Sequence, residues 1–432
     1  MQYTGIFPRA GWIHATNVYE VNVRQYTPEG TFNALFAEMP RLRAMGVDTL
    51  WFMPITPIAQ QQKKGTMGSP YACSDYTAIN PEFGTIEDFI ALVKGAQALG
   101  FKVIIDWVAN HTGWDHVWTK SHPEYYKHDA ETGTFKIASG MDDIIELDYE
   151  NADMRNAMIE SMRYWITAAG IDGFRCDLAS WVRVDFWRQA RTALEETKNL
   201  FWLAEMDPIE SREYMEVFDA AYTWKWMHRS EDFYKKQLPL DSLTQLLQDY
   251  NDNAGDHPIK LWFTSNHDEN SWNGTEYEKY GDSASLFAVH SFTWDGIPLI
   301  YSGQELPNHK RLEFFDKDTI AWNGEYQLAS FYSALLSLRR RNTALHAADD
   351  SITTYLLNIN SDKKVLAYLR SNGRQEVLVL LNFSGEETAL YLNDPVLKGQ
   401  FNNVFFPQEQ LDLPFEEIFT MRPWQYLVYE KG

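Results

Sequence analysis

The sequence predicts a (β/α)8 barrel with a short insertion after its third strand and a C-terminal antiparallel β-sandwich. Three observations support this fold class. Apolar segments of strand length alternate with amphipathic helical segments between residues 18 and 341. Several of these strands are almost continuously apolar, as expected for parallel strands buried on both faces. After about residue 350, predicted strands follow one another with no helix between them.

Each element of the predicted barrel rests on its own pattern. The strands are short apolar runs, and the helices carry apolar residues at helical spacing, with Gly46 and Gly100 ending the first two. The predicted strands are 18–23, 47–54, 102–108, 171–177, 200–205, 217–223, 259–264 and 297–301. The predicted helices are 31–45, 85–99, 152–169, 184–198, 242–251, 283–294 and 327–341.

The 432 residues exceed the usual size of one core, so two domains are expected. We assign residues 1–345 to the barrel, with the polar, irregular segment 112–150 as a short inserted domain, because such long loops are usually functional. Residues 346–432 form the sandwich, which we expect to cover the barrel flank. Its predicted strands are 352–357, 365–370, 376–383, 388–392, 404–406 and 425–429.

Composition narrows the class of partner. The chain carries 38 basic and 60 acidic residues, a net charge of −22, which disfavours nucleic acid and anionic membranes and favours a neutral partner. Aromatic residues reach 15%, and they suit both stacking on neutral sugars and core packing. Two cysteines, Cys73 and Cys176, give neither a disulfide framework nor a zinc pattern. The sequence does not indicate an oligomeric state.

No apolar run reaches the length of a membrane span, and the N-terminus lacks the charged and apolar regions of a secretory signal. We therefore expect a cytoplasmic protein. A periplasmic or secreted protein whose leader has been removed is the alternative.

Charged and polar residues stand where four of the predicted barrel strands end. Asp106, Asp177 and Glu205 follow three apolar runs, and His267 and Asp268 follow a fourth. Arg175 lies two positions before Asp177, on the same face of its strand, and should lower the pKa of that carboxyl. A purely structural ion pair is the alternative for this strand alone. Because a barrel holds its active site at these strand ends, the groups should converge on one rim.

Four short motifs give a specific resemblance. Asp106-x-x-x-Asn110-His111, Gly173-Phe174-Arg175-x-Asp177, Glu205 and Asn266-His267-Asp268 resemble the signatures of the α-amylase family of glycoside hydrolases, in the family's order. Segments 147–151 and 296–305 resemble two further signatures of that family. The resemblance covers essentially the whole chain.

The resemblance implies a role for each residue. Asp177 would be the nucleophile, Glu205 the acid/base, and Asp268 the carboxylate that favours the transition state. His111 and His267 would hydrogen-bond the reacting sugar, Tyr71 would stack under it, and Asp106 would support Arg175. Retaining hydrolysis needs one ionised and one protonated carboxyl roughly 5–5.5 Å apart. The apolar neighbours of Glu205, Leu203 and Ala204, favour the raised pKa that an acid needs.

The chain departs from the family pattern at two informative places. The run 178–181 lacks the lysine–histidine pair that many endo-acting members carry, so Trp181 is expected to stack on the product side instead. Ala72 stands where exo-acting α-glucosidases usually have an aspartate, which favours an endo-acting or oligosaccharide-trimming enzyme.

No cofactor is required by this interpretation, and calcium is an open alternative. Asn110 matches a calcium ligand of the family, and Asp142 or Asp143 would be further oxygen donors. However, the sequence contains no dense calcium-binding loop.

We therefore expect a retaining α-glycosidase that hydrolyses α-glucosidic bonds, α-1,4 in the first place, in α-glucans or malto-oligosaccharides. The alternatives within the family are a glucan transglycosylase and an α-1,6- or exo-acting α-glucosidase. The alternative of another class is a non-catalytic glucan-binding relative, which the presence of all three carboxylates disfavours.

Overall fold

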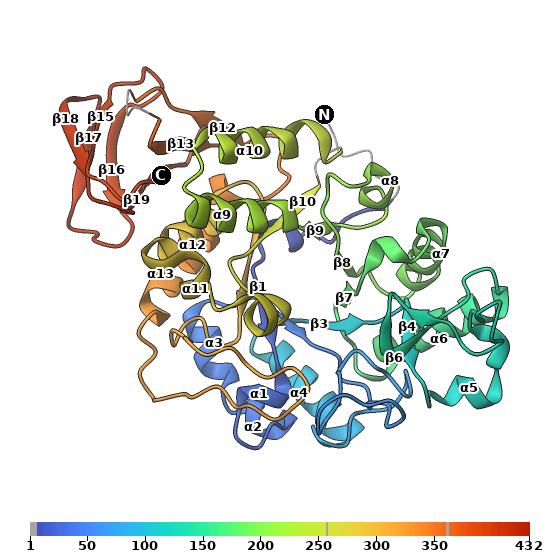
Figure 1. The fold of residues 1–432 in the computed structure, drawn as a ribbon. Helices are drawn as coiled ribbons and strands as arrows, with labels where there is room; N and C mark the ends of the chain where they lie inside the picture. The colour runs from blue at the N-terminus through green and yellow to red at the C-terminus, as the bar shows by residue number, and fades with distance from the viewer. Residues whose placement is uncertain (1–6, 256–257, 360–362) are drawn as a thin grey trace.

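The computed structural model describes residues 7–255, 258–359 and 363–432. Within these ranges eight parallel strands close into a barrel, as the sequence predicted, and each strand pairs with its neighbours in chain order until the last returns to the first (Figure 1). The strands are β1 (Val18–Val21), β2 (Thr49–Phe52), β3 (Lys102–Trp107), β7 (Gly173–Cys176), β8 (Phe201–Ala204), β9 (Ala220–Tyr222), β10 (Ile259–Trp262) and β11 (Ile297–Tyr301).

Two apolar cores hold the barrel together. One lies among the inward side chains of the strands and includes Trp51, Phe201 and Leu261. The other fills the space between the strands and the surrounding helices and includes Phe52 and Trp165. Because alternate strand residues point to opposite faces, a strand that feeds both cores must be apolar throughout, which explains the continuous runs.

The helices form the outer layer. They are α1 (Val23–Tyr26), α2 (Phe32–Phe36), α3 (Met39–Met45), α4 (Ile86–Ala98), α6 (Ala152–Ala168), α7 (Val184–Glu195), α8 (Arg212–Met215), α9 (Trp224–Lys236), α10 (Asp241–Asn253), α11 (Glu276–Tyr280), α12 (Ala284–Thr293) and α13 (Ala329–Arg341). Local sequence sets their ends: Thr85 and Asp88 form a capping box at α4, and Gly46, at φ 116°, ends α3.

The prediction of one helix over residues 31–45 was wrong in one respect, because this segment forms two helices, α2 and α3. Pro40 lies in the first turn of α3, where its missing N–H costs nothing, but it would interrupt a helix continuing from α2. Residues 23–26 turn into α1 rather than extending β1, and α9 was not predicted.

The inserted segment is more regular than predicted. It contains α5 (Val117–Ser121) and a three-stranded antiparallel sheet in the order β4 (His111–Gly113), β6 (Met141–Glu146) and β5 (Ile137–Ala138). These strands are too short and too polar to give a clear alternating pattern. Because β4 begins four residues after β3 ends, the sheet stands beside the rim of the barrel.

The C-terminal domain is antiparallel, as predicted. In the described residues its larger sheet has the order β12 (Thr353–Leu356), β13 (Val365–Ser371), β14 (Glu376–Asn382), β19 (Tyr426–Lys431), β16 (Gly399–Asn403) and β17 (Gln410–Leu413). A second sheet pairs β15 (Thr388–Leu392) with β18 (Phe415–Met421). The predicted strand 404–406 was wrong, because the strand is β16 just before it, and β17 and β18 were not predicted.

The C-terminal domain packs on the barrel flank at α12. Tyr368 contacts Thr293 through their hydroxyls at 2.6 Å and packs edge-on against Trp294. Figure 1 shows this domain and the inserted sheet on opposite sides of the barrel. Among the helices of the described ranges, none has the length and apolar character of a membrane span.

Candidate active site

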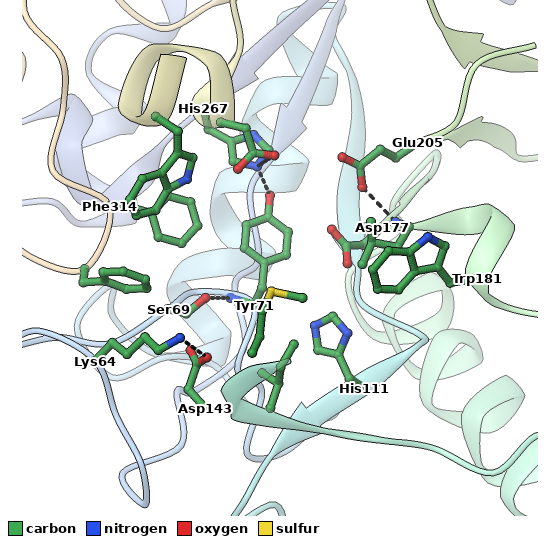
Figure 2. Close-up of a pocket in the computed structure, with 16 residues that line it drawn as sticks. Lys64, Ser69, Tyr71, His111, Asp143, Asp177, Trp181, Glu205, His267 and Phe314 are labelled. Atoms are coloured by element: carbon green, nitrogen blue, oxygen red, sulfur yellow. Dashed lines mark hydrogen bonds and ion pairs between the residues drawn. The ribbon is translucent and has the colours of Figure 1, made fainter. Parts of the chain in front are cut away.

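A pocket of about 430 Å³ opens at the C-terminal ends of the barrel strands (Figure 2). Side chains that follow four strands meet there: His111 after β3, Asp177 after β7, Glu205 after β8, and His267 with Asp268 after β10. Tyr71 lies between the two histidines in Figure 2. The convergence predicted from the strand ends is therefore present in the structure.

Arg175 is the centre of the charged network. Its guanidinium is fully buried, and one nitrogen, Nη1, donates to Asp106 Oδ1 at 2.9 Å and to Asp177 Oδ1 at 2.8 Å. The other nitrogen, Nη2, forms an ion pair with Glu205 Oε2 at 3.0 Å. Three carboxylates are thus held around one cation, and Asp106 contacts Arg175, the residue that it was expected to support.

The electrostatic effect on Asp177 differs from the sequence-based expectation. Burial raises the pKa of Asp177 to about 6, even though Arg175 lowers it, because Asp106 and Asp268 add negative charge nearby. Burial likewise raises the pKa of Glu205 to about 7, against the lowering effect of Arg175. One arginine shared by three carboxylates cannot hold each of them at a low pKa. The pKa of Asp177 is nevertheless lower than that of Glu205, so Asp177 is the stronger acid of the two.

Tyr71, His267 and Glu20 form a second network on the other wall. The Tyr71 hydroxyl lies 2.8 Å from His267 Nε2 and donates to Asp106 Oδ2 at 3.0 Å. The opposite nitrogen of His267 lies 2.5 Å from Glu20 Oε1, and Asp268 Oδ2 lies 3.3 Å from Nε2. Burial lowers the pKa of His267, but the two carboxylates outweigh it and hold that pKa well above its usual value.

Asp268 has the opposite balance. Burial raises its pKa, but His267, with Arg175 behind it, more than offsets this and keeps the carboxyl pKa below its usual value. Among Asp177, Glu205 and Asp268, Asp268 is therefore the most readily ionised.

His111 and Trp181 occupy different depths. His111 is buried, and burial lowers its pKa to about 4, so the ring is neutral at pH 7 and suited to hydrogen bonding with a hydroxyl. Trp181 is 48% exposed at the mouth of the pocket, beside Glu205 in Figure 2. An exposed indole in this position offers a flat apolar face to a ligand. Ala72 is buried in an apolar cluster with Ala59 and Ile144.

The donors proposed for calcium do not fit such a site. The Asn110 amide donates to His111 Nδ1 at 3.3 Å, and Asp142 and Asp143 each lie 2.9 Å from the Lys64 ammonium. Within the described ranges, no group of three or more His, Cys, Asp or Glu side chains is arranged to hold a metal ion. A calcium ion needs six to eight oxygen ligands, so no step of the chemistry is assigned to one.

Several residues of the pocket, and of the buried networks that contact it, were not predicted. Glu20 lies on β1, which barrel closure brings next to β11. Tyr222, at the end of β9, accepts a hydrogen bond from Arg175 Nε at 3.1 Å through its hydroxyl oxygen. Trp272 lies in a short π-helix, Glu269–Asn273, and Phe314 and Lys64 come from long loops; the sequence revealed the course of none of these segments. A polar residue inside an apolar first strand was the one available signal, and it pointed to Glu20.

Comparisons with known proteins agree with this geometry. The family model described as the catalytic domain of alpha amylase matches residues 12–129 and 122–342. The noncanonic maltogenic alpha-amylase AmyB from Thermotoga neapolitana has a similar structure, with a TM-score of 0.87, 29% identity, and coverage of 97% of this chain and 99% of that one. An alpha-amylase from Lactobacillus plantarum gives a TM-score of 0.86 at 28% identity, with coverage of 97% and 99%.

Similarity to curated sequences is weaker but extensive. Alpha-amylase MalA of Haloarcula japonica is 27% identical over 405 residues, which is 88% of this chain and 57% of that protein. The chain thus spans little more than half the length of this relative. Since the family model covers well over half of the chain, the chain belongs to the α-amylase family.

Proposed function

We propose that the protein is a retaining α-glycosidase that hydrolyses α-1,4-glucosidic bonds in α-glucans or malto-oligosaccharides. The observation that carries the proposal is the placement of Asp177 and Glu205 on one buried guanidinium, facing an aromatic-lined pocket. Their pKa values, about 6 and about 7, leave one carboxyl the better nucleophile and the other the better acid near neutral pH.

In the first step the ionised Asp177 attacks the anomeric carbon, and a carbon–oxygen bond to the enzyme forms as the glycosidic bond breaks. The protonated Glu205 gives its proton to the departing oxygen. In the second step Glu205, now ionised, takes a proton from water, and that water displaces Asp177 from the sugar. Two inversions leave the product in its original α configuration.

The surrounding groups assist these steps. Asp268 and His267 are charged hydrogen-bonding partners for sugar hydroxyls, and the Asp268 carboxylate stabilises the positive charge that develops in the transition state. Tyr71 offers its ring to one face of the sugar, and Phe314 stacks behind it with ring centres 6.1 Å apart.

A time course on maltoheptaose tests the proposal. We expect saccharides shorter than the substrate, released as α-anomers and resolved by length and by NMR of the anomeric proton. The Asp177→Asn variant should lose this turnover on every substrate that the wild type cleaves. β-Anomeric products, or full turnover by Asp177→Asn, would refute the assignment.

Transglycosylation is the second candidate, and Trp181 favours it. This half-exposed indole stands on the side from which the leaving group departs, where it would hold an acceptor sugar against the glycosyl-enzyme. Three relatives carry the name alpha-1,4-glucan:maltose-1-phosphate maltosyltransferase, one of them 35% identical over 205 residues. With concentrated maltotriose, products longer than maltotriose would indicate transfer, and Trp181→Ala should reduce them relative to hydrolysis products.

A further inference from the structure

Lys64 spans the pocket at the end opposite to Glu205. Its ammonium lies 2.9 Å from Asp143 and 2.9 Å from Asp142, so it links the long loop after β2 to the first residues of β6 in the inserted sheet. Lys64 and Asp143 both line the pocket, and Asp143 is only 5% exposed. Figure 2 shows this pair on the far side of Tyr71 from Glu205 and Trp181.

The loop that carries Lys64 is fixed at several points. The Thr66 backbone N–H donates to Asp316 at 2.8 Å, and the Met67 N–H donates to the Phe315 carbonyl at 3.0 Å. Gly65, at φ 59°, packs so closely that a Cβ there would lie 2.6 Å from the Phe315 side chain. Lys64 is therefore presented by an anchored segment, and its position is not that of a freely moving surface lysine.

The inserted sheet is fixed on its side as well. The Trp114 indole donates to the Asp142 carbonyl at 2.8 Å, which ties the start of β6 to the loop after β4. The Lys64 pair therefore joins two braced segments across the pocket. Met141 and Ile144 of β6 also line the pocket, so the wall around the pair is apolar.

The direction of the substrate follows from the proposed chemistry. The leaving group departs on the Glu205 side, and the anomeric carbon faces Asp177. In an α-1,4 chain the preceding sugar is attached at C4, across the ring from the anomeric carbon. The chain on the non-reducing side therefore runs over Tyr71 and away from Glu205, toward Lys64 and Asp143.

Resting on the proposed function, we infer that the ion pair of Lys64 with Asp143, supported by Asp142, ends the pocket on the non-reducing side and limits the fragment removed from that end. The substrate class is then the non-reducing ends of linear α-glucans, trimmed into short oligosaccharides. Ala72 is buried and absent from the pocket lining, so it does not close this end of the pocket, and the ion pair does.

The test uses maltoheptaose labelled with 18O at its reducing end, so that unlabelled products report the length removed from the other end. The wild type should release mainly short unlabelled fragments. In Lys64→Ala we expect the ratio of longer to shorter unlabelled fragments to rise by about threefold or more, as suits the loss of a partly exposed ion pair. This ratio does not depend on how much of the enzyme is active.

Lys63→Ala is the matched control, since Lys63 precedes Lys64 on the same loop and bonds Gln60 Oε1 outside the pocket. Its fragment ratio should equal that of the wild type. Asp143→Asn, which keeps the side-chain size, gives an independent reading if Lys64→Ala folds poorly, and it should shift the ratio in the same direction.

The outcomes separate the inference from the proposed function. An unchanged fragment ratio in both Lys64→Ala and Asp143→Asn would refute the inference that the ion pair ends the pocket. It would not contradict the proposed glycosidase function. Absence of α-glucan cleavage by the wild type would instead overturn the proposed function. A charge exchange, Lys64→Asp with Asp143→Lys, that restores short fragments would support the ion pair as the determinant.

Discussion

The backbone N–H of Leu178 donates a hydrogen bond to the Glu205 carboxylate at 2.8 Å. Leu178 directly follows Asp177 and has a left-handed conformation, at φ 42° and ψ 47°, which is unusual for a leucine. Such strain persists only where the surrounding structure imposes it, and it clusters at functional sites. The main chain after the proposed nucleophile thus positions the proposed acid.

Glu205→Gln should lower kcat on maltotriose by about 10²–10⁴-fold, because the amide retains the shape and accepts the Leu178 hydrogen bond but cannot deliver a proton. A substrate whose leaving group needs no proton, such as α-maltosyl fluoride, should recover part of this loss. Glu210→Gln, which changes a glutamate outside the pocket lining, is the control and should retain wild-type kcat. If kcat falls by less than about tenfold in Glu205→Gln, another residue must be the general acid.

The pH dependence of kcat/KM should be bell-shaped and narrow. Asp177, with a pKa of about 6, must be ionised, so activity rises as the pH passes through that value. Glu205, with a pKa of about 7, must be protonated, so activity falls as the pH passes through that value. The two limbs belong to the interacting pair as a whole. An optimum above about pH 8 would contradict the role of Glu205 as the acid.

The catalytic candidates were predictable because, in a barrel, residues at the C-terminal ends of different strands come together on one face. Asp106 is the penultimate residue of β3, Asp177 and Glu205 directly follow β7 and β8, and parallel strand ends meet on one rim. The charge balance was not predictable, since the sequence shows Arg175 beside Asp177 but not that Asp106 and Glu205 share the same guanidinium.

Arg175→Lys should destabilise the fold by about 3–5 kcal/mol, because a single ammonium cannot satisfy three buried carboxylates that the planar guanidinium holds together. The loss should grow as the pH rises, since the carboxyls whose pKa values are raised by burial then become charged without adequate compensation. Urea unfolding at pH 5 and pH 8 measures both effects. Arg183→Lys, at an exposed position, should change stability by less than about 0.5 kcal/mol.

Tyr71→Phe should lower kcat/KM by about tenfold and hardly change the melting temperature. The variant keeps the stacking face but loses the hydroxyl contacts to Asp106 and His267. Tyr71→Ala should lose more, because the platform for the sugar disappears as well. Tyr355→Phe removes a hydroxyl from an exposed tyrosine of the C-terminal domain and should match the wild type. If Tyr71→Phe and the wild type have equal kcat/KM, the Tyr71 hydroxyl does not contribute to catalysis.

Elements that depend on long-range packing were the ones that the sequence did not reveal. The amphipathic helix α9 went unpredicted because six of its thirteen residues are charged, and β17 is only four residues long, too short for its alternation to stand out. Lys64 and Phe314 lie 250 residues apart in the chain, and their meeting in one pocket follows from loop conformations that no local pattern encodes.

Gly173→Ala should destabilise the barrel, although glycine in a strand usually weakens it and alanine would normally be the better residue. A Cβ at this position would lie 2.1 Å from the Phe201 carbonyl oxygen of β8, so the two strands would have to separate. Overpacking of this kind costs about 1–3 kcal/mol, and the displacement would also move Arg175 and Asp177 relative to Glu205. We therefore expect both a lower unfolding free energy in urea and a lower kcat. Gly11→Ala, where a Cβ meets nothing within 4 Å, is the matched control and should change neither quantity.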